Sequence, residues 1–191
     1  MLATPHAARD KLKVENGKLK IVFQKAVPED APILTETRRR VWDATYRGIY
    51  PDEMIDDYDY PSHSARDLAR ISDPNNVVWL VMDGSDCVGY LYVGPCGYGP
   101  YKDFDFCLNS LYFLPPYQHR GLGRQAFVLV TEECRRRGND KFFCGCNAHN
   151  LNARAFYEHM GGVLGAQSVG HENQAEDQVY YEFSLNPAPP I

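Results

Sequence analysis

From residue 19 almost to its end, the chain consists of short apolar stretches separated by turn-forming residues. Runs rich in β-branched and aromatic residues predict strands, and apolar residues three and four positions apart predict amphipathic helices. The predicted strands cover residues 19–27, 77–82, 87–93, 105–114, 141–147, 163–169 and 178–185. The predicted helices cover residues 28–45, 64–71, 121–137 and 150–160. This mixture predicts an α+β fold.

The two ends of the chain lack this pattern. Residues 1–18 show no sustained periodicity and contain the turn-like pair Asn16 and Gly17, so we expect an N-terminal tail or a loosely packed segment. Residues 19–185 are predicted to form one domain, and residues 186–191 a C-terminal tail. A length of 191 residues is typical of a single domain of this kind.

The composition indicates a globular protein, with 44% apolar, 13% aromatic and 24% charged residues. The formal net charge of −5 argues against nucleic acid as a partner, because affinity for nucleic acids depends on a basic surface. No apolar run approaches the roughly 18 to 20 residues that span a bilayer, and the N-terminus has no apolar signal segment. We therefore expect a soluble, cytoplasmic protein without membrane or nucleic-acid partners.

The six cysteines fit neither a disulfide framework nor a zinc site. Disulfide frameworks occur mostly in short secreted chains, and zinc sites need paired CxxC or Cys/His spacings. Here there is only one close pair, a CxC at Cys144 and Cys146. We expect reduced cysteines in the core and no bound metal.

A glycine-containing turn lies between the strand at 105–114 and the helix at 121–137. Its sequence, residues 118–123, is Q-H-R-G-L-G. Such a turn directs backbone N–H groups at the start of a helix toward a bound anion, and Arg120 and Arg124 can add positive charge. Taken alone, a turn of this kind is more often only a structural connection. It matches neither the P-loop pattern nor the dinucleotide-binding fingerprint.

A second motif, at residues 150–162, reads N-L-N-A-R-A-F-Y-E-H-M-G-G. Together the two motifs resemble the GNAT superfamily of N-acetyltransferases, in which Q/R-x-x-G-x-G/A and N-x-x-A-x-x-F-Y-E-x-x-G occur at this separation. The resemblance extends over residues 19–185. It implies a single GNAT-like domain with a central mixed, mostly antiparallel sheet of about six or seven strands and about four or five flanking helices. One departure is Gly162, where an aromatic residue usually follows the glycine.

The resemblance implies acetyl-CoA as cosubstrate and assigns roles by position. A strand edge at Leu111, Tyr112 and Phe113 would pair with the pantetheine amides, and Asn150 would hydrogen-bond the same arm or serve as a helix N-cap. Tyr157 would contact the cofactor beside the sulfur and act as general acid, although an isolated tyrosine is more often a packed core residue. The residues that would bind the pyrophosphate are Gln118, His119, Arg120, Gly121, Leu122, Gly123 and Arg124.

The general base is the part of the pattern that this chain does not match. Many relatives carry a Glu where this chain has Cys107, and some carry a His where it has Asn109. Neither side chain is suited to take a proton from an amine. Asp105, two residues before Cys107 on the same predicted strand face, or a chain of water molecules would serve instead.

The acceptor is expected to bind near residues 38–61. There residues 45–53 resemble the corresponding stretch of the bacterial polyamine acetyltransferases of the Pai type. An acidic run is interleaved with Tyr50, Tyr58 and Tyr60, a composition that suits a cation through charge and cation–π contacts, although a solvated loop would look the same. The acids of the run are Asp52, Glu53, Asp56, Asp57 and Asp59. The residues that we expect to contact the acceptor are Trp42, Tyr46, Tyr50, Asp56 and Asp57.

These observations favour an N-acetyltransferase that acts on a primary amine of a small molecule, with a polyamine as one candidate. A protein lysine or N-terminal acetyltransferase is an alternative, but it would need an open groove, which the loops at 50–61 and 94–104 could obstruct. A non-catalytic acyl-CoA-binding sensor is a third reading, favoured by Cys107 and opposed by the intact motif around Tyr157. A homodimer is compatible with all three.

Overall fold

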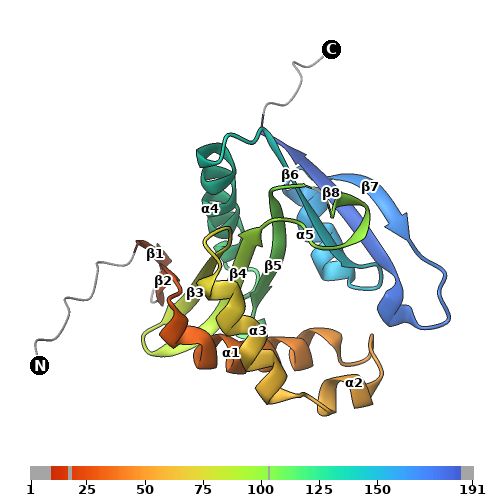
Figure 1. The fold of residues 1–191 in the computed structure, drawn as a ribbon, viewed down its shortest axis with the longest axis horizontal. Coiled ribbons are helices and arrows are strands. Elements are labelled where there is room, and N and C mark those ends of the chain that lie inside the picture. The colour runs from red at the N-terminus through yellow and green to blue at the C-terminus, as the bar shows by residue number, and fades with distance from the viewer. Residues whose placement is uncertain (1–9, 17–18, 103, 186–191) are drawn as a thin grey trace, which may run out of the picture.

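A twisted sheet of eight strands forms the centre of the computed structural model, which describes residues 10–16, 19–102 and 104–185 (Figure 1). The strand order is β1-β2-β3-β4-β5-β6-β8-β7. The strands are β1 (Lys11–Asn16), β2 (Leu19–Lys25), β3 (Val77–Asp83), β4 (Asp86–Gly94), β5 (Cys107–Phe113), β6 (Lys141–Asn147), β7 (Val163–Ser168) and β8 (Gln178–Ser184). The α-helices are α1 (Ala31–Tyr46), α2 (Asp52–Asp56), α3 (Tyr60–Ser72), α4 (Leu122–Arg136) and α5 (Leu151–His159).

The predicted α+β class and the mixed, mostly antiparallel sheet are confirmed. Every adjacent pair of strands is antiparallel except β5 and β6. The sheet has one strand more than the upper prediction because residues 11–16 form β1, which pairs with β2 along its whole length. Leu12 of this strand packs against the main core, so these residues belong to the sheet and not to a tail. The alternation of charged and apolar residues in β1 is too short to stand out as a period.

The helices form two groups. α1 packs against α3 and β4, and α3 also packs against β3. Figure 1 shows α1, α2 and α3 together, apart from α4 and α5. The second group is joined by aromatic contacts, such as that of Phe127 in α4 with Phe156 in α5, at 5.4 Å between ring centroids. α1 lies against β4 and α4 against β5, so both groups pack on the middle strands of the sheet.

The buried side of α1 includes Thr37 and Val41 together with Leu34 and Arg38, whereas Ile33 is 42% exposed. Residues 28–30 form a 3-10 turn, so the α-helix begins only at Ala31.

The cysteines are all buried, as predicted for core residues. None of the helices in the described part of the chain combines the length and the apolar character needed to cross a membrane.

Candidate active site

The central feature of the site is a gap between β5 and β6. These parallel strands pair only at Cys107 with Phe143 and at Leu108 with Cys144. Beyond that point β5 continues to Phe113 and β6 to Asn147, and residues 109–113 have no strand partner on the β6 side within the described chain. Leu111, Tyr112 and Phe113 lie on this edge. An unpaired strand edge offers alternating N–H and C=O groups to an extended ligand that carries amides.

A bulge marks the start of the gap. Tyr92 of β4 pairs with Ser110 and Val93 pairs with Leu108, which leaves Asn109 without a partner on β4. The Asn109 side chain donates hydrogen bonds to the carbonyl oxygens of Gly94 and Pro95, both at 3.3 Å. Asn109 therefore holds the loop after β4 and has no free group for proton transfer.

Tyr157 of α5 lies behind the gap and is 6% exposed. It is near the side chain of Cys144 on β6 and acts to lower the pKa of that thiol, although burial raises that pKa overall. Burial raises the pKa of Tyr157 well above its usual value, and nearby cysteines and tyrosines raise it further. The hydroxyl therefore keeps its proton at neutral pH, which is the state a proton donor needs.

Tyr98 is a residue of this region that the sequence did not single out. It lies in the loop between β4 and β5, and its side chain is near Gly145 on β6: a Cβ atom on Gly145 would lie 3.3 Å from the Tyr98 ring. It is also close enough to Tyr157 to contribute to the raised pKa of that residue. Only the fold brings the Gly/Pro-rich loop at 94–100 to the same gap.

Cys107, which stands where many relatives carry a Glu, and Asp105, the predicted base, differ in their surroundings. Cys107 is fully buried, and burial followed by the neighbouring Cys96 raises its pKa, so it stays a neutral thiol. Asp105 is exposed and lies in a bend before β5, which begins only at Cys107. The expectation that Asp105 shares the strand face of Cys107 is therefore wrong, and its role as a base stays a prediction.

The loop before α4 has the backbone geometry of an anion site. His119 and Gly121 both adopt positive φ angles, of 55° and 77°, and Gly121 is the N-cap of α4. A side chain on Gly121 would meet nothing within 4 Å, so the space in front of this backbone is open. A backbone in which positive φ angles alternate with a negative one, here at Arg120, turns successive N–H groups toward one point.

Gly123 has a packing role in addition to the predicted contact with a phosphate, which stays a prediction. A Cβ atom at this position would lie 2.7 Å from the ring of Phe156 in α5. The absence of a side chain is thus required by helix packing, whether or not a phosphate binds. The sequence motif alone could not separate these two reasons.

The other residues of this segment are placed as follows. The Gln118 side chain donates to the carbonyl oxygen of Phe113 at 2.9 Å, which ties the loop to the end of β5. Leu122 is a core residue, so only its backbone is available to a ligand. Arg120 lies over the ring of Tyr117, and Arg124 is exposed on the first turn of α4.

Asn150 is the N-cap of α5, as one of its two predicted roles requires. Its side-chain oxygen accepts a hydrogen bond from the Ala153 N–H at 3.1 Å. Its contact with a cofactor stays a prediction.

Three of the predicted acceptor residues form one aromatic cluster with the edge of β5. The rings of Tyr46 and Tyr50 stack at 4.4 Å, and Trp42 contacts Tyr46 edge-on at 5.2 Å. The hydroxyls of Tyr46 and Tyr112 lie 2.6 Å apart. Burial raises the pKa of Tyr46 and of Tyr112, and Tyr112 is in turn near Tyr157. The cluster therefore connects α1 with the gap.

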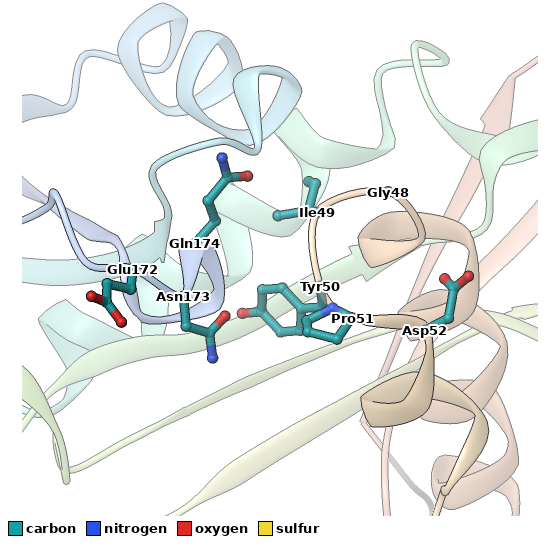
Figure 2. A pocket seen from close by; sticks show the side chains of 8 residues that line it. All are labelled: Gly48, Ile49, Tyr50, Pro51, Asp52, Glu172, Asn173 and Gln174. Atoms are coloured by element: carbon teal, nitrogen blue, oxygen red, sulfur yellow. The ribbon is translucent and has the colours of Figure 1, made fainter.

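Tyr50 also lines a hollow of about 660 Å³ on the surface (Figure 2). One wall is the segment 48–52 between α1 and α2, and the other comprises Glu172, Asn173 and Gln174 in the loop before β8. Figure 2 shows the Tyr50 ring extending from its own wall toward the Asn173 side. The second wall was missed in the sequence, where residues 170–177 appear only as a polar connection between two strands.

The acidic run is largely engaged within the protein. Arg47 forms ion pairs with Asp43, with Asp52 at 3.2 Å and with Asp56 at 2.8 Å. Its guanidinium lowers the pKa of Asp56. Asp56 and the exposed Asp57 do not line the hollow, so they stand apart from the other predicted acceptor residues.

The comparisons with known proteins agree with this arrangement. The family model of the acetyltransferase (GNAT) family matches residues 36–162. The chain belongs to the GNAT family. As a member of this family it is an acyltransferase. It is 26% identical over 142 residues to the uncharacterized N-acetyltransferase YjgM of Escherichia coli K12, and the alignment covers 73% of this chain and 80% of that protein.

Two solved structures share the fold of this GNAT protein. The PaiA N-acetyltransferase of Thermoplasma acidophilum, solved with coenzyme A, has a TM-score of 0.70 at 20% identity and covers 87% of this chain and 99% of its own. A ribosomal-protein-alanine N-acetyltransferase of Brucella melitensis has a TM-score of 0.64 at 21% identity, with 85% and 99% covered. At these identities the likeness concerns the fold alone, so it does not decide the acceptor.

Proposed function

We propose that this GNAT protein transfers the acetyl group of acetyl-CoA to a primary amine of a small molecule. The observation that carries the proposal is the gap between β5 and β6, with the buried hydroxyl of Tyr157 on one side and an aromatic path to the hollow on the other. The unpaired edge at 109–113 would hold the pantetheine amides. The N–H groups of the loop at 118–123 would bind the pyrophosphate, with Arg120 and Arg124 adding charge.

Tyr157 would supply the proton that the leaving group needs. As the neutral amine nitrogen bonds to the acetyl carbon, the carbon–sulfur bond breaks, Tyr157 donates its proton to the departing sulfur, and the proton that the acylated nitrogen loses returns to the Tyr157 oxygen through water. A backbone N–H of the 111–113 edge would stabilise the negative oxygen that forms on the acetyl carbonyl. Neither step requires a covalent bond to the protein.

The amine must lose a proton before it can attack. For an amine with a lysine-like pKa, forming the neutral species at pH 7 costs about 4.6 kcal/mol. Cys107 and Asn109 cannot accept this proton, for the reasons given above. Asp105 or a water chain through the hollow is the proposed route.

The finer proposal is that the acceptor is a di- or polyamine or another compact cation. It is supported by the half-buried ring of Tyr50, which lines the hollow, by the carboxylates at the two walls of the hollow, Asp52 and Glu172, and by the Pai-type resemblance of residues 45–53. The ion pairs of Arg47 limit what Asp52 and Asp56 can contribute.

The proposal is tested by measuring thiol release from acetyl-CoA in the presence of spermidine, putrescine, a neutral-tailed monoamine such as benzylamine, and peptides with a free N-terminus or lysine. We expect turnover with small amines and much less with peptides. Faster turnover with peptides would favour a protein acetyltransferase. Binding of acetyl-CoA without turnover on any acceptor would favour the sensor.

A further inference from the structure

A buried carboxylate, Asp177, closes the loop that forms the second wall of the hollow. The residue is 5% exposed. One of its oxygens accepts hydrogen bonds from the backbone N–H of His171 at 3.0 Å and from the Nδ1 of His171 at 2.7 Å. The other oxygen lies 2.8 Å from the Nε2 of His149, in the turn between β6 and α5. We call these three residues the Asp177 clasp.

The clasp acts on both ends of the loop. His171 and Asp177 flank the wall residues 172–174, so their hydrogen bonds fix the loop's width. His149 belongs to a segment far away in the sequence, so its bond fixes the loop to the end of β6. The donors lower the pKa of Asp177, which therefore stays ionised at neutral pH.

A second buried side chain holds the same wall from below. Asn147, which is 1% exposed, donates to the carbonyl oxygen of Gln174 at 2.7 Å. Asn147 is also near enough to the side chain of Tyr50 on the opposite wall to act on its pKa, in the lowering direction, although burial raises that pKa overall. Both walls of the hollow thus lie against the end of β6, the strand that borders the gap.

The wall at 172–174 carries a carboxylate, Glu172, whose surroundings differ from those of Asp52 on the opposite wall. Asp52 is paired with Arg47, whereas no hydrogen bond or ion pair of the Glu172 side chain is present among the described residues. Asp52 shares Arg47 with Asp43 and Asp56, so a cation in the hollow would find on Glu172, across from the ring of Tyr50, a carboxylate that no cationic side chain in the described part of the protein engages.

We propose that the Asp177 clasp positions the wall at 172–174 for the acceptor, and that Glu172 on this wall selects a cationic acceptor. Asp177, His149 and His171 are positioning residues in this scheme, since they act through the loop. The inference rests on the proposed function and extends it from the gap to the loop before β8.

The test measures acceptor binding, so that its result does not depend on turnover. Spermidine is titrated by calorimetry into the full-length protein saturated with coenzyme A, and coenzyme A is titrated separately. The variants are Asp177→Asn, which keeps the size but removes the charge and one acceptor oxygen, and Glu172→Gln. Glu176→Gln is the matched control, an exposed acid of the same loop that does not line the hollow.

We expect Asp177→Asn to weaken spermidine binding about tenfold, as for the loss of a hydrogen bond to a charged group, with coenzyme A affinity unchanged. Glu172→Gln should weaken spermidine binding about threefold and make that binding less dependent on salt, as for the loss of a partly exposed charge. Glu176→Gln should bind like the parent.

The inference is overturned if the parent does not bind spermidine, or if Glu172→Gln binds it as the parent does with the same salt dependence. It is also overturned if a folded Asp177→Asn protein, judged by its circular dichroism, loses coenzyme A and spermidine affinity equally. Since Glu172 is exposed, its variant will fold even if Asp177→Asn does not. Thiol release by the parent is measured independently and decides the proposed function.

Discussion

The proposed cofactor side and the proposed acceptor side of this GNAT protein are built in different ways. The proposed cofactor side consists mainly of backbone: the unpaired edge of β5 and the N–H groups of the loop before α4. The proposed acceptor side consists of side chains from three separate segments, at 42–52, 147–149 and 171–177, joined by hydrogen bonds and ion pairs. Backbone geometry depends on a few glycines at set spacings and so leaves a motif. Contacts between distant side chains leave none.

The largest effect should come from the residue that stands between the two sides. Tyr157→Phe removes a proton donor and little packing, so turnover should fall by about 10²- to 10⁴-fold, while coenzyme A affinity changes little. Tyr101→Phe is the control, because it also removes one tyrosine hydroxyl, which here hydrogen-bonds Glu182 at 2.8 Å and has no proposed role in catalysis. The comparison is steady-state turnover against calorimetric affinity. Parental turnover in Tyr157→Phe over pH 6 to 9 would mean that water protonates the thiolate.

How far each side could be predicted follows from the same contrast. The mixed sheet, the strand 141–147 and the helix starts at 121 and 150 were foreseen to within about two residues, because periodicity and capping are local. Asp105 was misplaced because the strand begins at Cys107, a boundary that no local signal marks. The Asp177 clasp could not be foreseen, since His149 and Asp177 are brought together only by the pairing of β6 with β8.

Gly123 tests whether the cofactor side is purely a matter of backbone. A methyl group at this position would press on the Phe156 ring at 2.7 Å, so Gly123→Ala should lower the free energy of unfolding by about 1 to 3 kcal/mol. Urea denaturation measures this loss without any ligand. An unchanged midpoint would show that Phe156 moves aside at no cost and that the glycine serves the phosphate alone.

Gly121 probes the phosphate contact without this packing effect. Its φ of 77° and the open space before it suit Gly121→Asn, because asparagine tolerates the left-handed region and adds a side chain where a phosphate would approach. Coenzyme A affinity should fall about tenfold, as for the loss of a charge-assisted hydrogen bond.

The control for this variant is Gly138→Asn, at the other end of α4. Gly138 has a φ of 79° and equally open surroundings, so the two substitutions carry the same backbone cost. Calorimetry should show coenzyme A binding to Gly138→Asn like the parent. Equal losses of coenzyme A affinity in both variants would show that the loop at 118–123 does not bind the phosphates.

The smallest effect on acceptor binding is expected from the acidic run, which the sequence indicates as the main attraction for a cation. The acidic run suggests that Asp56 and Asp57 attract a polyamine, but Asp56 is already ion-paired with Arg47, and both acids lie outside the hollow. Replacing both by Asn should therefore raise KM for spermidine only about twofold, an effect that salt screens, and leave KM for acetyl-CoA fixed. Glu172→Gln should have the larger effect in the same assay. If the double variant instead weakens spermidine more than Glu172→Gln does, the acceptor side works as a diffuse acidic surface, and the difference between a backbone-built side and a side of specific contacts does not hold.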